Sequence, residues 1–582
     1  MKKNLLNVLI FVLVNFPGNA QWNGNPLVGT PVVTTSPTTS KTDNVAATDG
    51  AGGMFTAWID NRNATVPAIY IQRILADGTL KFVSEVVVSN ASGASSSNKQ
   101  NLAIIADGAG GAICVWQDAR NRTSTPALNN DDIYGQRIDA NGNVLWTVNG
   151  VRLTVADNTV SNKIAPAIEL VNNTEAIIVY RDNRVAADVD LYAQKILISN
   201  GAPQWAAEVA IHGSQPNTQQ AQVVTKDGTG GLFVVWEDPR VSTTDRNIYA
   251  QRIDNTGALL WGAAGLLVCN AVFNQLTPQL TSDGAGGIAI TWTDQRLGSG
   301  DGNIFAQRLS ATGAEIWATN GVAVATPPLV QSNPYIISSG SDFIVAWNDQ
   351  RVTGNRDIYA QKIAAADGST LWATVNGVAI TNATGNQPSS AGNNVLLPDG
   401  SNGAVIIWDD ARNTSSNQDI YAQRINTSGV VQWTPDGVPV STATNNQSSP
   451  VAINSIGERV IVAWRDSRSG PTTTTYGEIF AARLQSNGVL PIRSLSINAL
   501  VKNASIDVKW TTVDESNTDF FIIEKSGDGT RYSSIGSVKA KGTGNGAYLL
   551  NDVTPVKGAN YYRIKTTDKN GASYYSSIAL VQ

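Results

Sequence analysis

The chain has 582 residues and a formal net charge of −5, from 41 basic and 46 acidic side chains. This length is too great for one ordinary hydrophobic core, so several domains or an extended array of repeats must account for it. The slight acidic excess offers no basic surface to nucleic acid or to an anionic membrane, so both partners are disfavoured.

The first twenty residues predict a secretory signal peptide. Lys2 and Lys3 precede an apolar stretch from Leu5 to Phe16, and Gly18-Asn19-Ala20 ends the segment in a form suited to cleavage. No later run of about 20 apolar residues predicts a transmembrane helix. We therefore expect residues 1–20 to be removed and the mature protein to be secreted, extracellular or held at the cell surface.

Residues 21–33 resemble the last strand of a repeat that lacks its first three strands. Gln21-Trp22, followed by Leu27 to Val33, matches Gln432-Trp433 followed by Gly437 to Val440. The last repeat ends at Leu484 and has Ile492 where a tryptophan belongs. We expect the N-terminal strand to complete the last repeat, which would close a ring and leave no exposed sheet edge.

An aromatic-x-Asp-x-Arg motif recurs eight times, with 55 to 64 residues between successive copies. The copies are Trp58-Asp60-Arg62, Trp116-Asp118-Arg120, Tyr180-Asp182-Arg184, Trp236-Asp238-Arg240, Trp292-Asp294-Arg296, Trp347-Asp349-Arg351, Trp408-Asp410-Arg412 and Trp464-Asp466-Arg468. This spacing is too long for a pair of helices and suits a four-stranded sheet with long loops. The motif predicts an all-β fold, an eight-bladed β-propeller, over residues 21–492.

Each repeat predicts four antiparallel strands. In the fourth copy, the turn at residues 227–231 separates the first two strands, and Asn255-Thr256-Gly257 separates a third strand from Ile248 and a fourth from Leu259. Of the 15 tryptophans, seven lie in second strands and seven in fourth strands. Nearly all are therefore expected to pack between neighbouring blades.

The Asp and Arg of each motif are predicted to pair, because residues at i, i+2 and i+4 of a strand point to one side. Eight copies favour a structural network over eight active sites. A cation on the third strand, such as Arg137, Lys195 or Arg252, is expected to join the pair. Calcium bound by the aspartates is the alternative, although the neighbouring arginine competes with any cation.

The chain offers little material for other metal or nucleophilic chemistry. His212 is the only histidine, and Cys114 and Cys269 lie in different repeats. A disulfide would need two distant blades to touch, and zinc needs three or four clustered ligands. We expect both cysteines to be buried apolar residues and no cofactor other than a possible calcium ion.

A second partial ring precedes the motif aromatic residues by 16 to 21 positions, in the loops that lead into the first strands. Its members are Lys41, Lys99, Lys163, Gln219, Gln275, Gln331, Gln387 and Gln447. Loops on this face vary in length, as recognition loops do. These side chains could hydrogen-bond a glycan or an acidic peptide at a channel mouth, or the amides could cap the first strands.

The third strand, its turn and the following tryptophan, as in residues 248–261, resemble the tryptophan-docking repeat of quinoprotein-like eight-bladed propellers. The resemblance covers about 15 residues per blade and implies tryptophans docked between blades. Dehydrogenases of that family also need a quinone pocket with calcium and a catalytic acid. The chain has no vicinal cysteine pair and no distinct acidic cluster, so only the architecture is carried over. The Ser-x-Asp-x-Gly-x-x-x-Trp box of sialidases is absent.

Residues 493–582 depart from the repeat and resemble a fibronectin type III module. Trp510, Val553 with Pro555, and Tyr561-Tyr562-Arg563-Ile564 match its core tryptophan and tyrosine-corner pattern. A propeller followed by such a module resembles secreted surface proteins of the Bacteroidetes.

Two functions remain open. The first expectation is a monomeric, exported, non-enzymatic binding or adhesion protein that recognises an extracellular glycan or protein. The alternative is an extracellular carbohydrate-active or other hydrolytic propeller enzyme, with acids on variable loops such as Asp131 with Asp132 or Asp301. That alternative needs two carboxylates within about 10 Å of each other, and no motif supports it.

Overall fold

The computed structural model describes residues 22, 25–33, 39–62, 66–92, 98–124, 127–128, 130–155, 161–184, 188–213, 215–298, 300–387, 394–414, 417–469, 477–486, 488, 496–512, 515, 518–541, 546–568, 573–576 and 578–581. The chain divides into two compact units: Asn23–Pro491, and a smaller unit formed by Met1–Trp22 with Ile492–Gln582. The predicted signal peptide, residues 1–20, lies outside the described residues.

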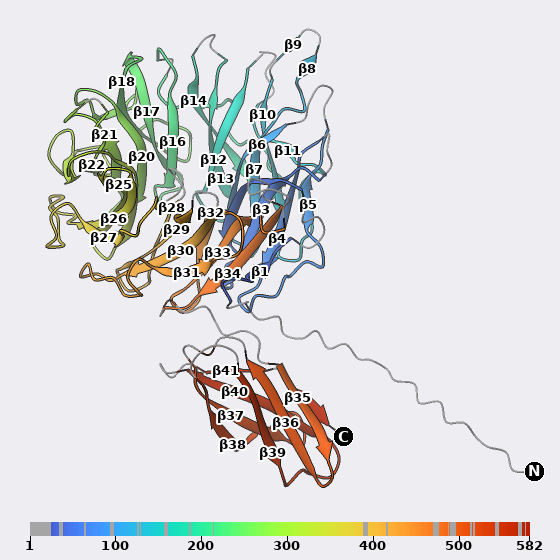
Figure 1. Ribbon diagram of the computed structural model, residues 1–582. Helices are drawn as coiled ribbons and strands as arrows, with labels where there is room; N and C mark the ends of the chain where they lie inside the picture. The colour runs from blue at the N-terminus through green and yellow to red at the C-terminus, as the bar shows by residue number, and fades with distance from the viewer. Residues whose placement is uncertain are drawn as a thin grey trace, which may run out of the picture. The chain divides into compact units, whose positions relative to one another are not determined.

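The larger unit contains eight four-stranded antiparallel sheets (Figure 1). In chain order their strands are β2 (Lys41–Thr48), β3 (Met54–Asp60), β4 (Ala68–Ile74), β5 (Val86–Ser89); β6 (Lys99–Ala106), β7 (Ala112–Asp118), β10 (Asp132–Ile138), β11 (Val151–Arg152); β12 (Lys163–Leu170), β13 (Glu175–Asp182), β14 (Asp190–Leu197), β15 (Val209–Ala210); β16 (Gln220–Lys226), β17 (Leu232–Ser242), β18 (Asp245–Ile253), β19 (Leu266–Cys269); β20 (Gln275–Ser282), β21 (Ile288–Asp294), β22 (Asn303–Leu309), β23 (Val322–Ala325); β24 (Gln331–Ser339), β25 (Asp342–Val352), β26 (Asn355–Ile363), β27 (Val378–Thr381); β28 (Asn394–Pro398), β29 (Ala404–Thr414), β30 (Asn417–Ile425), β31 (Val438–Ser441); and β32 (Gln447–Ser455), β33 (Arg459–Asp466), β34 (Glu478–Leu484) with β1 (Thr30–Pro31). A short hairpin of β8 (Thr123–Ser124) and β9 (Ala127–Leu128) extends a loop of the second sheet. The all-β expectation is confirmed, and the arrangement is that of a propeller-like fold.

The second strand of each sheet is buried because the neighbouring sheets cover both of its faces. Strands β3, β7 and β21 are buried along their whole length, and apolar clusters join each sheet to the next. Trp261 shows how the tryptophans dock, because its indole Nε1 donates to the Ala311 carbonyl of the following sheet at 3.2 Å. Apolar packing and one hydrogen bond to the following sheet therefore hold the fourth-strand tryptophans, Trp146, Trp205, Trp261, Trp317, Trp372 and Trp433.

The first strands carry a β-bulge at the same place in successive sheets. Pairing shifts between Gln100 and Ala103 in β6 and between Gln220 and Val223 in β16. The bulged residue Ala221 has a φ of 53°, a left-handed conformation that is unfavourable for a non-glycine residue. An extra residue in one strand changes which side chains face the partner sheet, so regular alternation does not apply at this end of the first strands.

Strands from the two ends of the larger unit meet in the last sheet. Thr30 and Pro31 of β1 pair with Ala481 and Phe480 of β34, and β2 lies against β32. The Asn44 amide donates to the Ser449 carbonyl at 3.0 Å. The paired strand is shorter than the seven residues expected from Leu27 to Val33.

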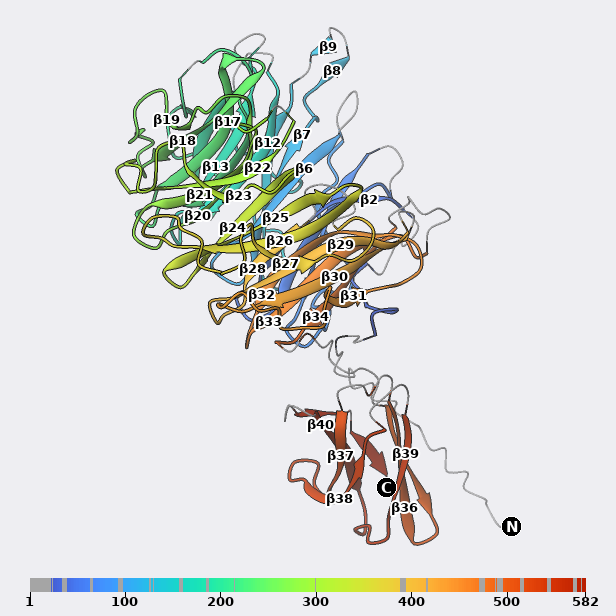
Figure 2. The same cartoon turned by 60° about the vertical axis from the view of Figure 1, so that its left-hand side comes forward.

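The smaller unit has two sheets (Figure 2). One contains β35 (Ser496–Lys502), β36 (Ser505–Thr512) and β39 (Gly546–Asp552); the other contains β37 (Thr518–Ser526), β38 (Ser533–Lys539), β40 (Asn560–Asp568), β41 (Ser573–Tyr575) and β42 (Ala579–Val581). Trp510 packs edge-on against Phe521 with ring centroids 5.9 Å apart, so the predicted tryptophan lies in the core. Among the described residues, no helix is long and apolar enough to cross a membrane.

Candidate functional site

Each Asp of the repeated motif is a buried acceptor for its own motif neighbours. In the fifth sheet, the Trp292 indole donates to Asp294 at 2.7 Å, and the Arg296 guanidinium donates to both Asp294 oxygens at 2.9 and 2.7 Å. Arg296 also donates to the Asn320 carbonyl and lies 3.9 Å from the Phe305 ring centroid. The Asp294 carboxylate is thus paired inside the sheet and is not available to a ligand.

Asp294→Ala is expected to lower the free energy of unfolding by about 3 kcal/mol, because it leaves the Arg296 charge without a carboxylate and the Trp292 indole without an acceptor. Urea unfolding followed by tryptophan fluorescence measures the change. Asp367→Ala is the matched control, because Asp367 is exposed in a turn. An equal loss in both variants would contradict the structural role of the motif.

The third-strand cations do not join the motif, which corrects the expectation for Arg137, Lys195 and Arg252. Arg137 pairs with Asp107 at 2.8 Å, Lys195 with Glu175 at 3.0 Å and Arg252 with Asp227 at 2.9 Å. Arg137 stands opposite Ile113 in β7, at the far end of the strand from Asp118. The cation is therefore too far along the strand to reach the motif and instead meets an acid in or beside the turn that precedes the second strand.

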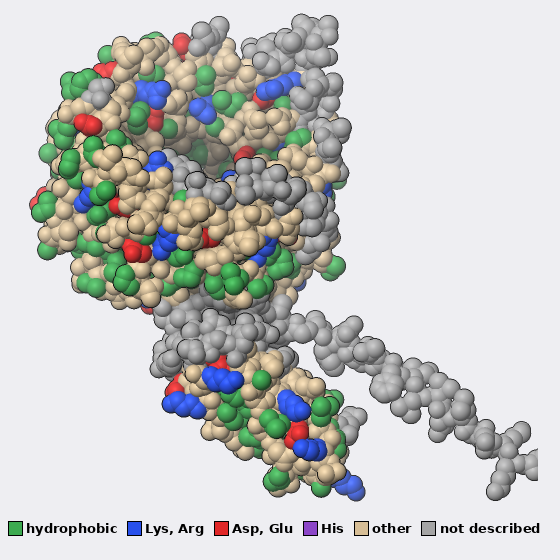
Figure 3. All heavy atoms as spheres, in the orientation of Figure 1, with side chains coloured by type: hydrophobic (Ala, Val, Ile, Leu, Met, Phe, Trp, Pro, Cys, Tyr) green, Lys and Arg blue, Asp and Glu red, His purple; other side chains and the backbone are tan. Residues whose placement is uncertain are grey.

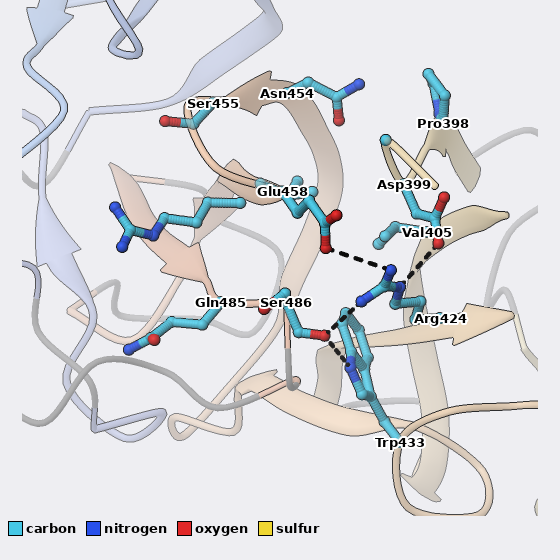
Figure 4. Close-up of a pocket in the computed structure, with 13 residues that line it drawn as sticks. Pro398, Asp399, Val405, Arg424, Trp433, Asn454, Ser455, Glu458, Gln485 and Ser486 are labelled. Atoms are coloured by element: carbon cyan, nitrogen blue, oxygen red, sulfur yellow. Dashed lines mark hydrogen bonds and ion pairs between the residues drawn. The ribbon is translucent and has the colours of Figure 1, made fainter. Parts of the chain in front are cut away.

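A small cavity of about 100 Å³ lies between the last two sheets, at the end of the strands where the third-strand cations meet their acids (Figure 4). Arg424 occupies it, contacting Asp399 at 2.9 Å and Glu458 at 3.5 Å and donating to the Ser486 carbonyl at 3.0 Å. Trp433 donates to the same carbonyl at 3.1 Å. Arg252 and Arg308 make the corresponding contacts in other sheets. The contacts in this cavity are therefore the ones that connect neighbouring sheets elsewhere in the larger unit.

The predicted ring of lysines and glutamines is buried, with every member at most 2% exposed. The amides of Gln219, Gln275, Gln331, Gln387 and Gln447 donate to carbonyls of their own preceding loops. Lys99 donates to the Pro67 and Ala91 carbonyls, and Lys41 to Thr39. These contacts are those expected of strand caps, and the binding role assigned to the ring stays a prediction.

The predicted ring contains lysine in some sheets and glutamine in others, and the two side chains have different effects on the aspartate that lies beside them. Lys163 lies 3.6 Å from Asp132, which also pairs with Arg152 at 2.7 Å. Gln219 takes the equivalent place one sheet later, where its backbone N–H donates to the Val189 carbonyl next to Asp190. Within the described residues, the Gln219 Oε1 atom and both carboxylate oxygens of Asp190 are buried without a hydrogen-bond partner.

Three such acids have displaced pKa values. Burial, together with nearby carboxylates, raises the pKa of Asp190, Asp357 and Asp419 to about 6. Each stands directly opposite a motif aspartate in the neighbouring strand: Asp182, Asp349 and Asp410. Two charges at this separation in a buried site are unfavourable, so one carboxylate of each pair retains its proton to a higher pH than usual.

The acids named for the hydrolytic alternative do not form a carboxylate pair open to a substrate. Asp131 accepts hydrogen bonds from Arg122 and from Gln117, and Asp132 pairs with Arg152. Asp301 donates its backbone N–H to the Gly298 carbonyl within its own loop. Asp131 and Asp132 thus already serve as ion-pair partners.

Two adjoining cavities lie along the first strands, and the larger unit is visibly hollowed in this view (Figure 3). One, of about 330 Å³, is lined by Asn101, Leu102, residues 165–167, Arg181, Ala221 and Gln222. The other, of about 240 Å³, is lined by residues 221–223, 277–279 and 333–335. They share Ala221 and Gln222, so together they form one surface across β6, β12, β16, β20 and β24.

This surface begins only two or three residues beyond the predicted ring. Asn101 follows Lys99 and Gln222 follows Gln219, and each lies within the β-bulge of its strand. The sequence therefore indicated the end of the first strands at which these cavities lie, and the binding role of the ring side chains themselves stays a prediction. Arg181 was missed altogether; the available signal was that an arginine follows Tyr180, the one motif copy without tryptophan.

The described residues supply no obvious metal site. No group of three or more His, Cys, Asp and Glu side chains in this part of the chain is arranged to hold a metal ion. Cys114 and Cys269 are buried free thiols, and burial raises the pKa of each to about 12. His212 is buried against Trp236, and burial lowers its pKa to about 4, so it remains neutral.

No protein-family model and no curated protein matches this sequence. Among solved structures, similarity is found to a protein of unknown function from Dyadobacter fermentans (11% identity, 57% of this chain and 96% of that chain, TM-score 0.31). The α-L-arabinanase of Penicillium chrysogenum is similar at 14% identity, with coverage of 59% and 98% and a TM-score of 0.30. The pectate lyase Pel3 of Pectobacterium carotovorum is 16% identical, and the match spans 16% of this chain and 27% of that one, with a TM-score of 0.13.

The comparisons correct the first functional expectation. The similar structures are mostly glycoside hydrolases, among them arabinofuranosidases, arabinanases and a galactanase. The expectation of a non-enzymatic binding or adhesion protein is therefore wrong on this comparison, and the hydrolytic alternative agrees with it better. TM-scores of 0.31 and below assign no site residue to this chain, so the site must be argued from its own geometry.

Proposed function

We propose that the larger unit is a closed eight-bladed β-propeller and that the exported, monomeric protein is a carbohydrate-active enzyme that hydrolyses an extracellular glycan in the cavities along its first strands. The pairing of β1 with β34 and the contact of β2 with β32 support the closed ring. The order of the strands in the smaller unit, β35-β36-β39 in one sheet and β38-β37-β40-β41 in the other, supports a fibronectin type III-like module.

The observation that carries the enzymatic proposal is that two carboxylates lie behind the wall of the same cavity, where each interacts with a residue that lines it. Glu237 accepts the backbone N–H of Thr277, a cavity residue, at 2.7 Å. On the other side, burial and, to a smaller extent, the charge of Asp409 raise the pKa of Tyr335, another cavity residue, to about 12. Hydrolysis of a glycosidic bond needs two such groups, one to protonate the leaving oxygen and one to activate water or attack.

The surroundings of Glu237 suit the second of these roles. Arg246 pairs with it at 3.2 Å, and Gln220 donates to it at 2.9 Å, so both contacts fix the position of the Glu237 carboxyl group. Asp409 is fully buried and is assigned the proton-donating role. Asn333 and Gln222 supply amide groups that can pair with sugar hydroxyls.

Incubation of residues 21–582 with a panel of plant and microbial polysaccharides, followed by product chromatography, tests the proposal. New reducing ends are expected from at least one substrate, and Glu237→Gln is expected to lower the rate at least 100-fold. Asp301→Asn is the control and should retain activity. Binding of a glycan without any product, or unchanged activity of Glu237→Gln with a native melting curve, would contradict it.

A further inference from the structure

The residue that follows the motif aromatic residue occupies one equivalent position in every sheet. These residues are Ile59, Gln117, Arg181, Glu237, Thr293, Asn348, Asp409 and Arg465. The polar members have partners near the bulges: Gln117 accepts from Asn101, Thr293 from the Asn333 N–H, and Asn348 from Asn394. Arg465 donates to the Ser449 hydroxyl. Polar side chains at this position are normally satisfied by the protein itself.

Arg181 differs from the others. Within the part of the chain that the structure describes, its guanidinium has no hydrogen bond or ion pair, and its Nε atom is buried without a partner. Burial lowers the pKa of Arg181, and no acid counters that effect. A partly buried arginine without a carboxylate is costly, because desolvation of the charge is not offset.

The same side chain lines the larger of the two cavities. Arg181 is the only charged residue among those that line this cavity, and its neighbours there are Asn101, Gln222 and a wall of Leu102 and Pro166. A guanidinium has a planar set of donors that matches a carboxylate or another oxyanion, and it binds such groups most strongly away from bulk water.

We propose that Arg181 is a specificity-determining residue that binds an acidic sugar unit, so that the substrate is an acidic oligosaccharide bearing a uronate carboxylate or a sulfate ester. This inference rests on the proposed function for the identity of the ligand as a glycan. The acidic group lies on Arg181 in the cavity of β6, β12 and β16, and the neighbouring sugar units extend along β20 and β24 toward Glu237 and Asp409.

Calorimetric titration of the full chain with a uronate tetrasaccharide, a sulfated tetrasaccharide and a neutral tetrasaccharide tests the inference. At least one acidic probe is expected to bind at least tenfold more tightly than the neutral probe, with an affinity that falls as salt is raised. The two acidic arms distinguish a carboxylate from a sulfate ester. Arg181→Gln should lose this preference, whereas Arg465→Gln, at the equivalent but hydrogen-bonded position, should keep it.

A stability measurement guards against misfolding as the cause. Arg181→Gln removes an uncompensated charge, so its melting temperature should equal or exceed that of the parent protein. The inference is overturned if acidic and neutral probes bind equally, if neither acidic probe binds at millimolar concentration, or if Arg181→Gln retains the preference. Cleavage of a neutral glycan that is unaffected by Arg181→Gln would refute the inference and leave the proposed function standing. Binding of an acidic probe through Arg181 without cleavage would support the inference and refute the proposed function.

Discussion

Removal of residues 21–35 is expected to lower the free energy of unfolding of the larger unit by on the order of 5 kcal/mol, because the last sheet loses its outer strand. Val32 and Val33 are 0% and 5% exposed, and the Val32 N–H donates to the Ile479 carbonyl at 2.8 Å. Arg468 also donates to the carbonyls of Leu27 and Val28. The deletion would leave β34 as an unpaired edge. Thermal unfolding should show a midpoint lower by roughly 5 to 10 °C.

A synthetic peptide of residues 21–35 should restore part of this loss when added in excess, because a segment that binds only the folded state stabilises it by mass action. Two single substitutions provide a finer comparison. Val32→Ala should cost about 2 kcal/mol, whereas Leu27→Ala should cost little because Leu27 is 60% exposed. A truncated protein with an unchanged melting temperature would refute the role of β1 in closing the last sheet.

The triple variant Asp190→Asn, Asp357→Asn, Asp419→Asn is expected to be more stable than the parent protein at pH 8, by roughly 4 kcal/mol in total. The folded pKa of each acid, about 6, lies above its ordinary value of 3.8. Their contribution to stability is therefore complete below about pH 4 and is lost as the pH rises through 6. Asparagine remains neutral, and an amide already occupies this position in two other sheets, at Asn247 and Asn303.

Urea unfolding at pH 5 and at pH 8 measures this effect. The free energy of unfolding of the parent protein should fall between pH 5 and pH 8, and that of the triple variant should fall much less. Asp132→Asn is the matched control, because Asp132 pairs with Arg152 and Lys163; it should destabilise the protein at pH 8. If Asp132→Asn and Asp190→Asn change stability in the same direction, the distinction between the lysine and glutamine sheets is wrong.

Much of the fold could be predicted because the same strand and turn pattern recurs in every repeat. The motif recurs at nearly constant spacing, so a single error in one copy does not change the assignment of the others. The four strands within each copy followed from turn residues such as those at 227–231, and in the structure the Gly231 N–H donates to the Asp227 side chain at 2.8 Å within that turn. The partner of Arg137 was not predictable in this way, because alternation along a strand gives a side but not the end at which a long side chain finds its acid.

The site depended on features that have little local signal. The cavity is lined by the bulge residues Asn101 and Gln222 and not by Lys99 and Gln219, and a bulge adds one residue without any distinctive residue type at these positions. The lack of a partner for Arg181 is a property of its neighbours in other sheets. Glu237 and Asp409 are 172 residues apart in the sequence, and only the arrangement of the sheets brings each of them next to a residue that lines the same cavity, Thr277 and Tyr335.

The sequence by itself determined the all-β class, the four-stranded repeat and the N-terminal strand that β34 pairs with, because these follow from short-range patterning and turn chemistry repeated along the chain. The tertiary structure alone decided which charges are satisfied, which aspartates retain protons and where the chain is hollow. Those properties depend on distances and burial between residues from different sheets, and electrostatic energies vary steeply with both.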